Sequence, residues 1–504
     1  MNGREKSDSA EVAVKPANKT GVPAAEQVER RAGTEGNAIP QSTSRTQGRA
    51  DASQARDRIR VAARRNKKEK FTALLHHVTP EALRDAFYAI AKNAAAGIDG
   101  ITWRDYEADL ERKLADLHDR VQSGAYRATP SRRVYIPKPD GGQRPLAVAA
   151  LEDKIVQRAV ADVLNAIYEE DFLGFSYGFR PGRGAHDALD ALSAAIYARK
   201  VNYIVDADIA KFFDSVSKEW LARSLEHRIG DKRVLRLIQK WLRAGVLEDG
   251  RIEVSERGER GRERPSRRCS PTSTCCYVLD LWAERWRRRE AKGDMVIVRY
   301  ADDAIFGFES ETDARRFLDA MRERLAAFAL TLHPDKTRLI EFGRFAAANR
   351  ERRGLSKPET FKFLGFTFIC GKSRKGGFLL KRKSRGDRMR AKLKEIKEGL
   401  RKRRHEPPSR QGQWLGQVVQ GWFNYHAAPT NIRVLSAFRF NVVDLWRRSV
   451  RRRSQKDVTT WKRIESLARE WLPPPKILHP WPSDRFRVKH PRWEPYAGIP
   501  PVRI

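Results

Sequence analysis

The chain has 504 residues and carries 101 Lys and Arg against 64 Asp and Glu, which gives a formal net charge of +37. This length excludes a small secreted scaffold and a single domain, because one domain usually holds about 100 to 200 residues. So large a positive surplus would repel itself unless a polyanion lies against it, and the charge therefore predicts a nucleic acid partner.

The first segment of the chain is polar and has hardly any aromatic residues. Residues 1–65 cannot bury enough apolar area to offset the entropy of ordering, so we predict a disordered extension over residues 1–68. The chain begins without the apolar region of a signal peptide, and no stretch reaches the roughly 18 apolar residues of a membrane helix. These patterns favour a cytoplasmic protein with no membrane partner.

Helical and strand patterns then alternate along the chain. Apolar residues at spacings of three and four predict helices near residue 71 and over residues 83–91, 103–121, 153–168, 217–228, 234–244 and 312–330. Alternating patterns and turn signals predict strands within residues 133–148, 202–207, 295–308, 361–368 and 377–380. This order indicates an α+β fold over residues 69–372. A basic helical region with interleaved aromatic residues follows over residues 373–504.

Acidic residues stand at the ends of two of these strand patterns. Asp302 and Asp303 lie between two apolar runs, at the tip of a hairpin, and Asp208 lies where the apolar run of residues 202–207 gives way. Carboxylates from two strands can hold two divalent ions roughly 3.5 to 4 Å apart, which activate a primer 3′-hydroxyl and neutralise the leaving pyrophosphate. Because such acids repel one another without a metal, the cluster predicts an ion site for nucleotidyl transfer.

The sequence also leaves structural roles open for these acids. Asp is common in turns, so an isolated pair such as Asp302 and Asp303 can serve turn geometry alone. Asp206 shares a strand face with Asp208 because side chains alternate with a period of two. We interpret Asp206 and Asp214 as helix-capping or ion-pairing residues rather than as metal ligands.

Several further motifs accompany the acidic cluster in a fixed order. Together with it they are the segments 135–146, 176–183, 208–214, 300–303, 333–337 and 361–366. In this combination the chain resembles a group II intron reverse transcriptase and maturase of the bacterial type, from about residue 71 to the end. The resemblance implies a right-hand polymerase with fingers and palm over residues 69–372, and a helical thumb and maturase region (domain X) over residues 373–504.

The resemblance implies a catalytic role for each matching residue of the acidic site. Asp208, Asp302 and Asp303 would bind two Mg²⁺ ions, and Lys336 would protonate the leaving pyrophosphate. Phe213 matches the aromatic steric gate that excludes a 2′-hydroxyl group, although an aromatic residue that follows a strand usually belongs to the core.

Six more residues match positions that hold substrates in this family. They are Lys138, Arg144, Arg180, Arg183, Leu364 and Gly365. The first two resemble fingers residues that hold the incoming triphosphate, a task suited to fixed cations, although surface charge alone also explains them. The two arginines in the loop punctuated by Gly and Pro would contact the template backbone. The Leu–Gly pair resembles the primer grip.

The implied function is RNA-directed DNA polymerisation, together with binding of intron RNA to assist splicing and retrohoming. Its partners would be group II intron RNA, an RNA template, a DNA primer or target, and dNTPs. The C-terminal cations would neutralise phosphates and the aromatic residues would stack on bases, although Trp422 and Phe423 can instead form core. The chain stops at Ile504 without an HNH endonuclease module, so we expect no DNA cleavage. A homodimer is left open.

One segment departs from the family pattern. Between Gly258 and Tyr277 the family has G-T-P-Q-G followed by S-P-L-L-A-N-x-Y-L, whereas this chain is rich in Arg and Ser there and holds Cys269, Cys275 and Cys276. Codons permitted for residues 259–276, when read one base earlier, spell the missing motif except at one position. Two compensating frame changes explain that agreement, so the cysteines predict no zinc site.

The departure leaves two functions open. Arg-rich polar sequence cannot be buried cheaply in place of an apolar element, so we predict local disorder over residues 259–276. If the segment is genuine, the chain is a catalytically impaired RNA-binding maturase or a pseudogene product. If it is a sequencing error, the natural chain is an active polymerase.

Overall fold

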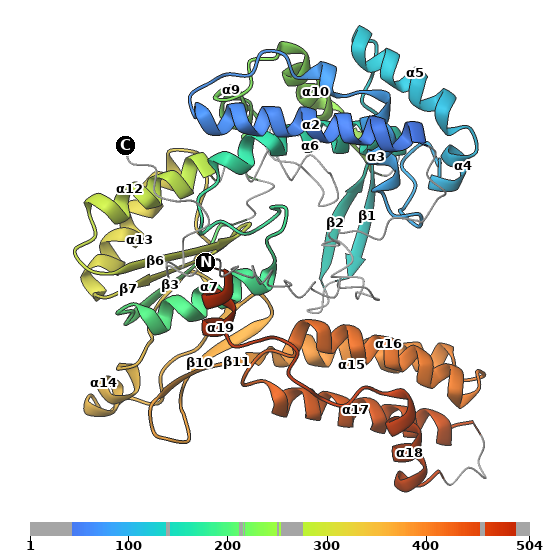
Figure 1. The fold of residues 1–504 in the computed structure, drawn as a ribbon. Coiled ribbons are helices and arrows are strands. Elements are labelled where there is room, and N and C mark those ends of the chain that lie inside the picture. The colour runs from blue at the N-terminus through green and yellow to red at the C-terminus, as the bar shows by residue number, and fades with distance from the viewer. Residues whose placement is uncertain are drawn as a thin grey trace, which may run out of the picture. The chain divides into compact units, whose positions relative to one another are not determined.

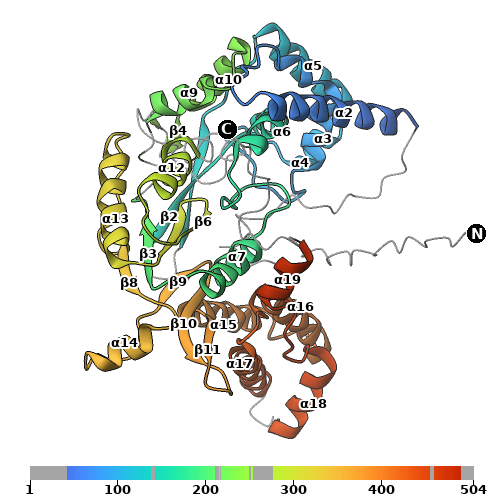
Figure 2. The same ribbon diagram turned by 60° about the vertical axis from the view of Figure 1, so that its left-hand side comes forward.

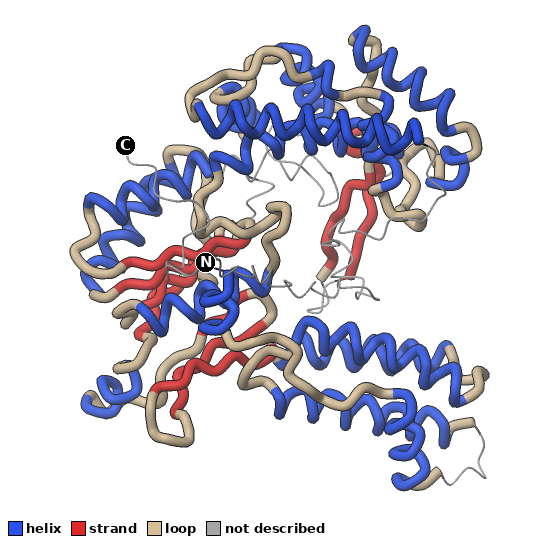
Figure 3. The backbone as a smooth tube through the Cα atoms, in the orientation of Figure 1, coloured by secondary structure: helices blue, strands red, loops and turns tan. Residues whose placement is uncertain are grey.

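The computed structural model describes residues 43–137, 142–210, 215, 217–248, 251–253, 276–453 and 459–489. Contacts divide these residues into two compact units, which are described separately below. The smaller unit holds Lys392–Ala427 and Ile432–Leu478, and the larger unit holds the rest of the described chain. The larger unit combines helices with sheets, whereas the smaller unit is helical (Figure 1, Figure 3). The predicted α+β class is therefore confirmed.

A helical layer forms one part of the larger unit. Its elements are α2 (Thr43–Arg65), η1 (Leu75–His77), α3 (Pro80–Tyr88), α4 (Trp103–Glu107), α5 (Leu110–Ser123), α6 (Leu151–Asp171), α9 (Lys218–Glu226) and α10 (Lys232–Arg243). Helix α6 carries apolar residues around most of its circumference and is buried accordingly. Helices α2 and α3 both pack along it, so α6 is the centre of this layer (Figure 1).

Helix α2 corrects the prediction that residues 1–68 are disordered throughout. Ile59 and Ala63 on this helix are buried in the same core as α6. The guanidinium of Arg228 donates to the carbonyl oxygen of Ala63, which fixes the end of α2. The few apolar residues of α2 did not predict burial because the surface that covers them comes from a helix distant in sequence. Residues 1–42 lie outside the described part of the chain.

Four strands form the first sheet, in the order β2-β1-β4-β5. They are β1 (Ser131–Pro137), β2 (Gln143–Val148), β4 (Val246–Glu248) and β5 (Arg251–Glu253). β1 and β2 make the predicted antiparallel hairpin, in which Tyr135 pairs with Pro145. β4 joins β1 in parallel and β5 in antiparallel orientation. The tip of the hairpin lies outside the described residues.

A central antiparallel sheet has the order β6-β7-β3-β8. Its strands and flanking helices are β3 (Tyr203–Asp208), β6 (Met295–Tyr300), β7 (Asp303–Phe308), β8 (Arg338–Glu341), α7 (Ala185–Ala198), α12 (Leu281–Arg289) and α13 (Glu311–Ala326). On one face, Val205 and Phe306 share a core with Phe317 of α13. Helix α7 contacts β6 and lies on the other side of the sheet from α13 (Figure 2). This order makes β3 and β7 neighbours although they are distant in sequence.

A third sheet has the order β11-β10-β9. The remaining elements of the larger unit are η3 (Cys276–Asp280), α14 (Ala346–Arg352), β9 (Phe361–Phe363), β10 (Phe366–Lys372), β11 (Phe378–Ser384) and α19 (Pro482–Lys489). Helix α19 packs on α7, and Arg485 Nη1 lies 2.6 Å from Asp190 Oδ2. β11 pairs with β10 and belongs to the larger unit. The boundary between the two compact units therefore falls at Lys392, whereas the sequence predicted a boundary at residue 373.

The smaller unit is built from long helices with aromatic cores. They are α15 (Gly386–Lys402), of which the first residues belong to the larger unit, α16 (Pro408–His426), α17 (Ile432–Arg451) and α18 (Trp461–Trp471). Trp446 is fully buried and donates to Gln411 Oε1 over 3.0 Å. Trp422 and Phe423 are also buried, so these two aromatic residues form core. Within the described ranges, no helix is both long and apolar enough to span a bilayer.

Candidate active site

The register of the central sheet brings the predicted acids together. Asp208 at the end of β3 is paired with Asp303 at the start of β7, and Tyr300 of β6 is paired with the same Asp303. Directly opposed residues of antiparallel strands hold their Cβ atoms about 4.5 to 5.5 Å apart. Asp302 lies in the intervening turn of β6 and β7. The expectation that Asp208 meets the acidic hairpin in space is therefore confirmed.

Lys336 also reaches this end of the sheet. It comes from the loop before β8, and its Nζ atom lies 2.8 Å from Asp208 Oδ2. The lysine side chain is 61% exposed, so it stands at the solvent-facing edge of the acidic group. The structure thus unites Lys336 with Asp208, although they are far apart in sequence.

Asp206 lies on β3 two residues before Asp208, further from the end of the strand. Burial raises the pKa of its carboxyl group to about 6, against the lowering influence of Arg338. Arg338 Nη2 lies 3.9 Å from Asp206 Oδ2. This contact agrees with the interpretation of Asp206 as an ion-pairing residue.

The chemistry of the acidic end suits a hard divalent cation. Carboxylate oxygens are the donors that Mg²⁺ prefers. Within the described residues, no three His, Cys, Asp or Glu side chains converge as a ready-made metal site. Asp208 and Asp303 nevertheless stand at paired positions, and the ammonium of Lys336 shows that a positive charge is held here. Asp208, Asp302 and Asp303 thus carry the donor type that Mg²⁺ prefers, and their binding of the ion stays a prediction.

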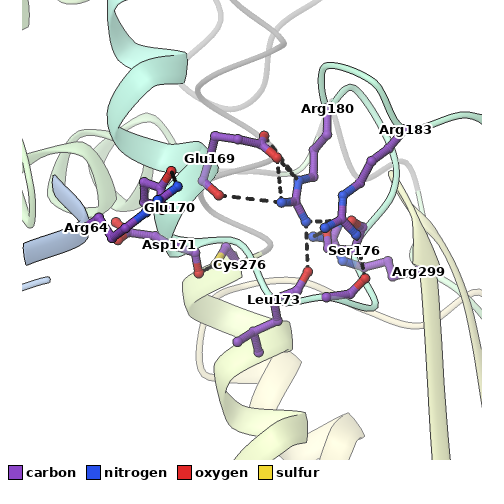
Figure 4. A network of polar contacts seen from close by, with 11 residues as sticks. Arg64, Glu169, Glu170, Asp171, Leu173, Ser176, Arg180, Arg183, Cys276 and Arg299 are labelled. Atoms are coloured by element: carbon purple, nitrogen blue, oxygen red, sulfur yellow. Dashed lines mark hydrogen bonds and ion pairs between the residues drawn. The ribbon is translucent and has the colours of Figure 1, made fainter. Parts of the chain in front are cut away.

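The Arg180 side chain is committed to contacts inside the protein (Figure 4). Its Nη2 atom lies 2.6 Å from Glu169 Oε1, and its Nη1 atom donates to the carbonyl oxygens of Leu173 and Ser176, each over 2.8 Å. Only 2% of the side chain is exposed. The prediction that Arg180 contacts the template is corrected, because its donors are consumed in holding its own loop.

Arg183 is also used within this loop (Figure 4). Its Nη1 atom donates to the carbonyl of Gly174 over 2.6 Å, and its guanidinium lies over the ring of Tyr177. Burial and the neighbouring Arg180 lower its pKa. The template contact predicted for Arg183 stays a prediction.

Leu364 and Gly365 form the two-residue turn between β9 and β10. Both have positive backbone φ angles, +44° and +81°. Glycine adopts such angles freely, whereas a bulky leucine does so at a cost of about 1–3 kcal/mol. The carbonyl of Gly365 accepts from the amide of Arg385 over 3.0 Å, which ties this strained turn to the end of β11.

Several predicted residues lie outside the described part of the chain. Lys138, Phe213 and Asp214 belong to undescribed segments, and only the backbone of Arg144 is described, paired with Ile136. Residues 254–275 are also undescribed. The disorder predicted for residues 259–276 therefore lies outside the described residues except at Cys276, and so do Cys269 and Cys275. Cys276, the last residue of that segment, is buried in η3, and burial raises its pKa.

Arg299 and Gly178 are residues of this site that the sequence did not single out. Arg299 is buried directly before the acidic turn, within an otherwise apolar strand. The two-residue period of β6 places Arg299 on the core-facing side of the strand, and this was the signal in the sequence that could have predicted its burial. Gly178 approaches the same turn so closely that a Cβ atom there would lie 2.2 Å from the amide nitrogen of Ala301. A close backbone approach leaves no pattern in a single sequence.

Part of the chain is similar to a known protein family. Residues 136–368 match the family described as reverse transcriptase (RNA-dependent DNA polymerase). The chain is 35% identical to Protein YkfC of Escherichia coli over 37% of this chain and 50% of that protein. It is 31% identical to the group II intron-encoded protein LtrA of Lactococcus lactis over 38% of this chain and 32% of that protein.

A relative from Saccharomyces cerevisiae shows the same likeness. The putative COX1/OXI3 intron 1 protein of Saccharomyces cerevisiae is 32% identical over 44% of this chain and 32% of that protein. The chain thus spans half or less of the length of these three relatives. The matched region includes the central sheet and the acidic residues at its end.

Proposed function

The chain carries a reverse transcriptase domain of the kind that group II introns encode, and from this premise we propose that it is an RNA-directed DNA polymerase. We further assign to it the binding of its intron RNA, which assists splicing and retrohoming. The register that pairs Asp208 with Asp303, beside Asp302 in the turn, carries the polymerase proposal. Fingers and palm over residues 69–372, and a thumb with domain X over residues 373–504, belong to this proposal.

In this function the acidic end of the sheet is the polymerisation centre. Asp208, Asp302 and Asp303 would hold two Mg²⁺ ions, which would supply positive charge for activating the primer 3′-hydroxyl and for neutralising pyrophosphate. Lys336, at 2.8 Å from Asp208, holds a proton close to the leaving group. Phe213 excludes ribonucleotides by contact with the 2′-hydroxyl group.

Other residues hold the substrates in place. Lys138 and Arg144 bind the triphosphate of the incoming dNTP. The turn of Leu364 and Gly365, with its two positive φ angles, supports the primer end. Orientation of this kind lowers the barrier because the reacting groups no longer have to find one another.

The smaller unit supplies a surface for RNA. Phe440 and Trp461 are 61% and 41% exposed and lie stacked at 5.5 Å between ring centroids. The guanidinium of Arg447 lies over the Trp461 ring. Exposed aromatic rings stack on unpaired bases, and the surrounding cations neutralise phosphates. Trp422 and Phe423 are excluded from this contact because they are buried.

Primer extension on an RNA template tests the polymerase. The unsubstituted chain should extend a DNA primer only when Mg²⁺ is present, and Asp302→Ala should lower the rate by at least about a hundredfold, since it removes a metal ligand. Asp319→Ala is the matched control, because Asp319 is an exposed residue of α13 that pairs with Arg322 on the same helix. Equal rates for Asp302→Ala and the unsubstituted chain would refute the proposal.

An RNA-binding maturase without polymerase activity is the alternative. It rests on residues 259–276, of which the structure describes only Cys276. Splicing of the intron RNA in the presence of the chain, with and without Asp208→Ala, separates the two functions. Splicing that survives this substitution, in a chain whose unsubstituted form extends no primer, would favour the maturase alone.

A further inference from the structure

A buried ion pair lies directly behind the acidic turn. The guanidinium of Arg299 contacts Asp280 through two parallel hydrogen bonds, Nε to Oδ1 over 2.6 Å and Nη2 to Oδ2 over 2.5 Å. Each side chain is only 1% exposed. Replacing such a pair by apolar residues is often neutral or stabilising, so its stability contribution alone does not account for it.

The same guanidinium also makes two hydrogen bonds to groups other than Asp280. Its Nη1 atom donates to the carbonyl oxygen of Ala301 over 2.7 Å, and its Nη2 atom donates to Ser176 Oγ over 2.7 Å. Ala301 is the first residue of the turn that leads to Asp302. One planar group thus joins three segments of the chain, η3, the loop after α6, and the acidic turn (Figure 4 shows its place beside Ser176).

The turn needs support because its backbone is strained. Ala301 has a φ of +57°, in the left-handed region that L residues avoid at a cost of about 1–2 kcal/mol. The hydrogen bond from Arg299 to the Ala301 carbonyl offsets that cost, because bonds from a charged donor are among the strongest in proteins.

The loop after α6 holds the turn from the other side. The amide of Arg299 donates to the carbonyl of Phe175 over 2.9 Å, and the amide of Tyr177 donates to the carbonyl of Arg299 over 2.8 Å. Gly178 then packs its backbone directly on Ala301. The strained turn is therefore enclosed on two sides, and Arg299 is the residue that both sides share.

We propose that Arg299 is a positioning residue for the acidic site. By holding the carbonyl of Ala301, it fixes the directions in which Asp302 and Asp303 present their carboxylates. Asp280 and Ser176 act through Arg299, since they orient its guanidinium. This inference rests on the proposed polymerase function for its consequence, whereas the structural role of Arg299 in the turn can be tested without activity.

The test compares Arg299→Lys with Arg382→Lys. A lysine can still neutralise Asp280, but its single ammonium cannot bond Asp280, Ser176 and the Ala301 carbonyl in the geometry of the guanidinium. Arg382 is the matched control because it forms another buried pair, Nη1 to Asp190 Oδ1 over 2.6 Å, with 3% and 1% exposure, away from the acidic turn. Both variants should melt at lower temperatures.

Two measurements separate positioning from general stability. Amide hydrogen exchange in the metal-free protein should speed up about tenfold at residues 299–303 in Arg299→Lys, the factor for one charge-assisted bond, and stay unchanged there in Arg382→Lys. The Mg²⁺ concentration for half-maximal primer extension should rise about 10- to 100-fold in Arg299→Lys only. Equal turn exchange in the two variants, or an equal rise in Mg²⁺ requirement, would overturn the inference.

A milder variant covers the case in which Arg299→Lys does not fold. Ser176→Ala removes one acceptor and leaves the ion pair intact, so it should shift turn exchange in the same direction by a smaller factor. Turn exchange at the unsubstituted rate in Ser176→Ala would then contradict the inference. If the unsubstituted chain extends no primer, the proposed function fails, while the exchange measurement still decides whether Arg299 holds the turn.

Discussion

At the scale of the residue, the charged groups of this protein behave according to how completely they are enclosed. Asp208 meets an exposed lysine at the end of the inner strand β3, where a second cation can still approach. Arg180 and Arg299 are enclosed on all sides, and their donors are consumed by fixed acceptors. Asp171 is an intermediate case, since it lies near Arg228 but is largely buried. Each enclosure has a consequence that a substitution can measure.

Asp171 makes stability depend on pH. Burial raises its pKa to about 6 despite Arg228, whose Nη1 atom lies 3.3 Å from Asp171 Oδ1. Because the folded pKa lies above the unfolded one, this contribution to stability is complete below pH 3.8 and is lost as the pH rises through about 6. Asp171→Asn should remove this loss, which is on the order of 2–3 kcal/mol. Urea unfolding at several pH values checks this, and equal pH slopes for both proteins would contradict it.

Arg180 should matter for folding rather than for template binding. Arg180→Ala leaves Glu169 without its buried partner, and breaking such a pair costs about 3–5 kcal/mol. Arg64→Ala is the comparison, because Arg64 pairs with Glu170, the residue after Glu169, but its side chain is 70% exposed. The unfolding midpoint of the Arg64→Ala variant should therefore not change measurably. Chemical denaturation gives both values. Reduced template affinity at unchanged stability in Arg180→Ala would restore the template contact.

At the scale of the element, the site is formed where strand ends meet turns of unusual conformation. The end of β3 lies beside the start of β7, and the turn between β6 and β7 begins with a left-handed alanine. The turn between β9 and β10 has two residues with positive φ. Strained turns persist only where their surroundings hold them, and they are frequent at functional sites. The loop after α6 provides this support for the acidic turn.

A methyl group at Gly178 should therefore disturb catalysis. Its Cβ would lie 2.2 Å from the backbone nitrogen of Ala301, which cannot move without shifting the acidic turn. Since a displacement of about 1 Å can cost a hundredfold in rate, Gly178→Ala should slow primer extension by roughly that factor. Gly182→Ala in the same loop is the control, because its φ of +70° brings backbone strain but nothing lies within 4 Å. Similar rates for both variants would show that strain alone is responsible.

At the scale of the whole molecule, the formal charge of +37 dominates the behaviour expected in solution. The cations are spread over both units, and each released counterion contributes to affinity for a polyanion. Helix α15 shows the arrangement clearly, since Ile396 and Leu400 are buried while Lys394, Lys397 and Arg401 are exposed. The three cations follow one another at spacings of three and four residues, so this helix presents a line of positive charge beside its apolar face.

Neutralising that line should weaken RNA binding in a salt-dependent way. Changing Lys394, Lys397 and Arg401 together to Gln should reduce the slope of log affinity against log salt by about 0.7 to 0.9 for each phosphate that the protein no longer neutralises. Arg315→Gln with Arg322→Gln is the control, because these exposed cations of α13 are paired with acids on the same helix. Filter binding at several salt concentrations gives the slopes. The same slope for the triple variant and the unsubstituted chain would exclude α15 from the RNA interface.

Local patterns in the sequence were sufficient for the acids and for many of the elements, but they did not predict α7, α12, β4, β5 or β8. The two-residue period of residues 202–208 and the hairpin around Asp302 and Asp303 predicted strands whose ends carry carboxylates, and the structure pairs Asp208 with Asp303. These features are encoded locally, because alternation and turn chemistry depend only on neighbouring residues. The family resemblance, carried by short motifs, was readable for the same reason.

Tertiary structure decided what the cations and the first helix do. Arg180 and Arg299 have the same side chain as exposed arginines, and only packing against Glu169, Ser176 and Asp280 makes them structural. Likewise, α2 is ordered because α6 covers its few apolar residues. Burial of a polar or sparse surface depends on partners brought from distant parts of the chain, so no local pattern can specify it.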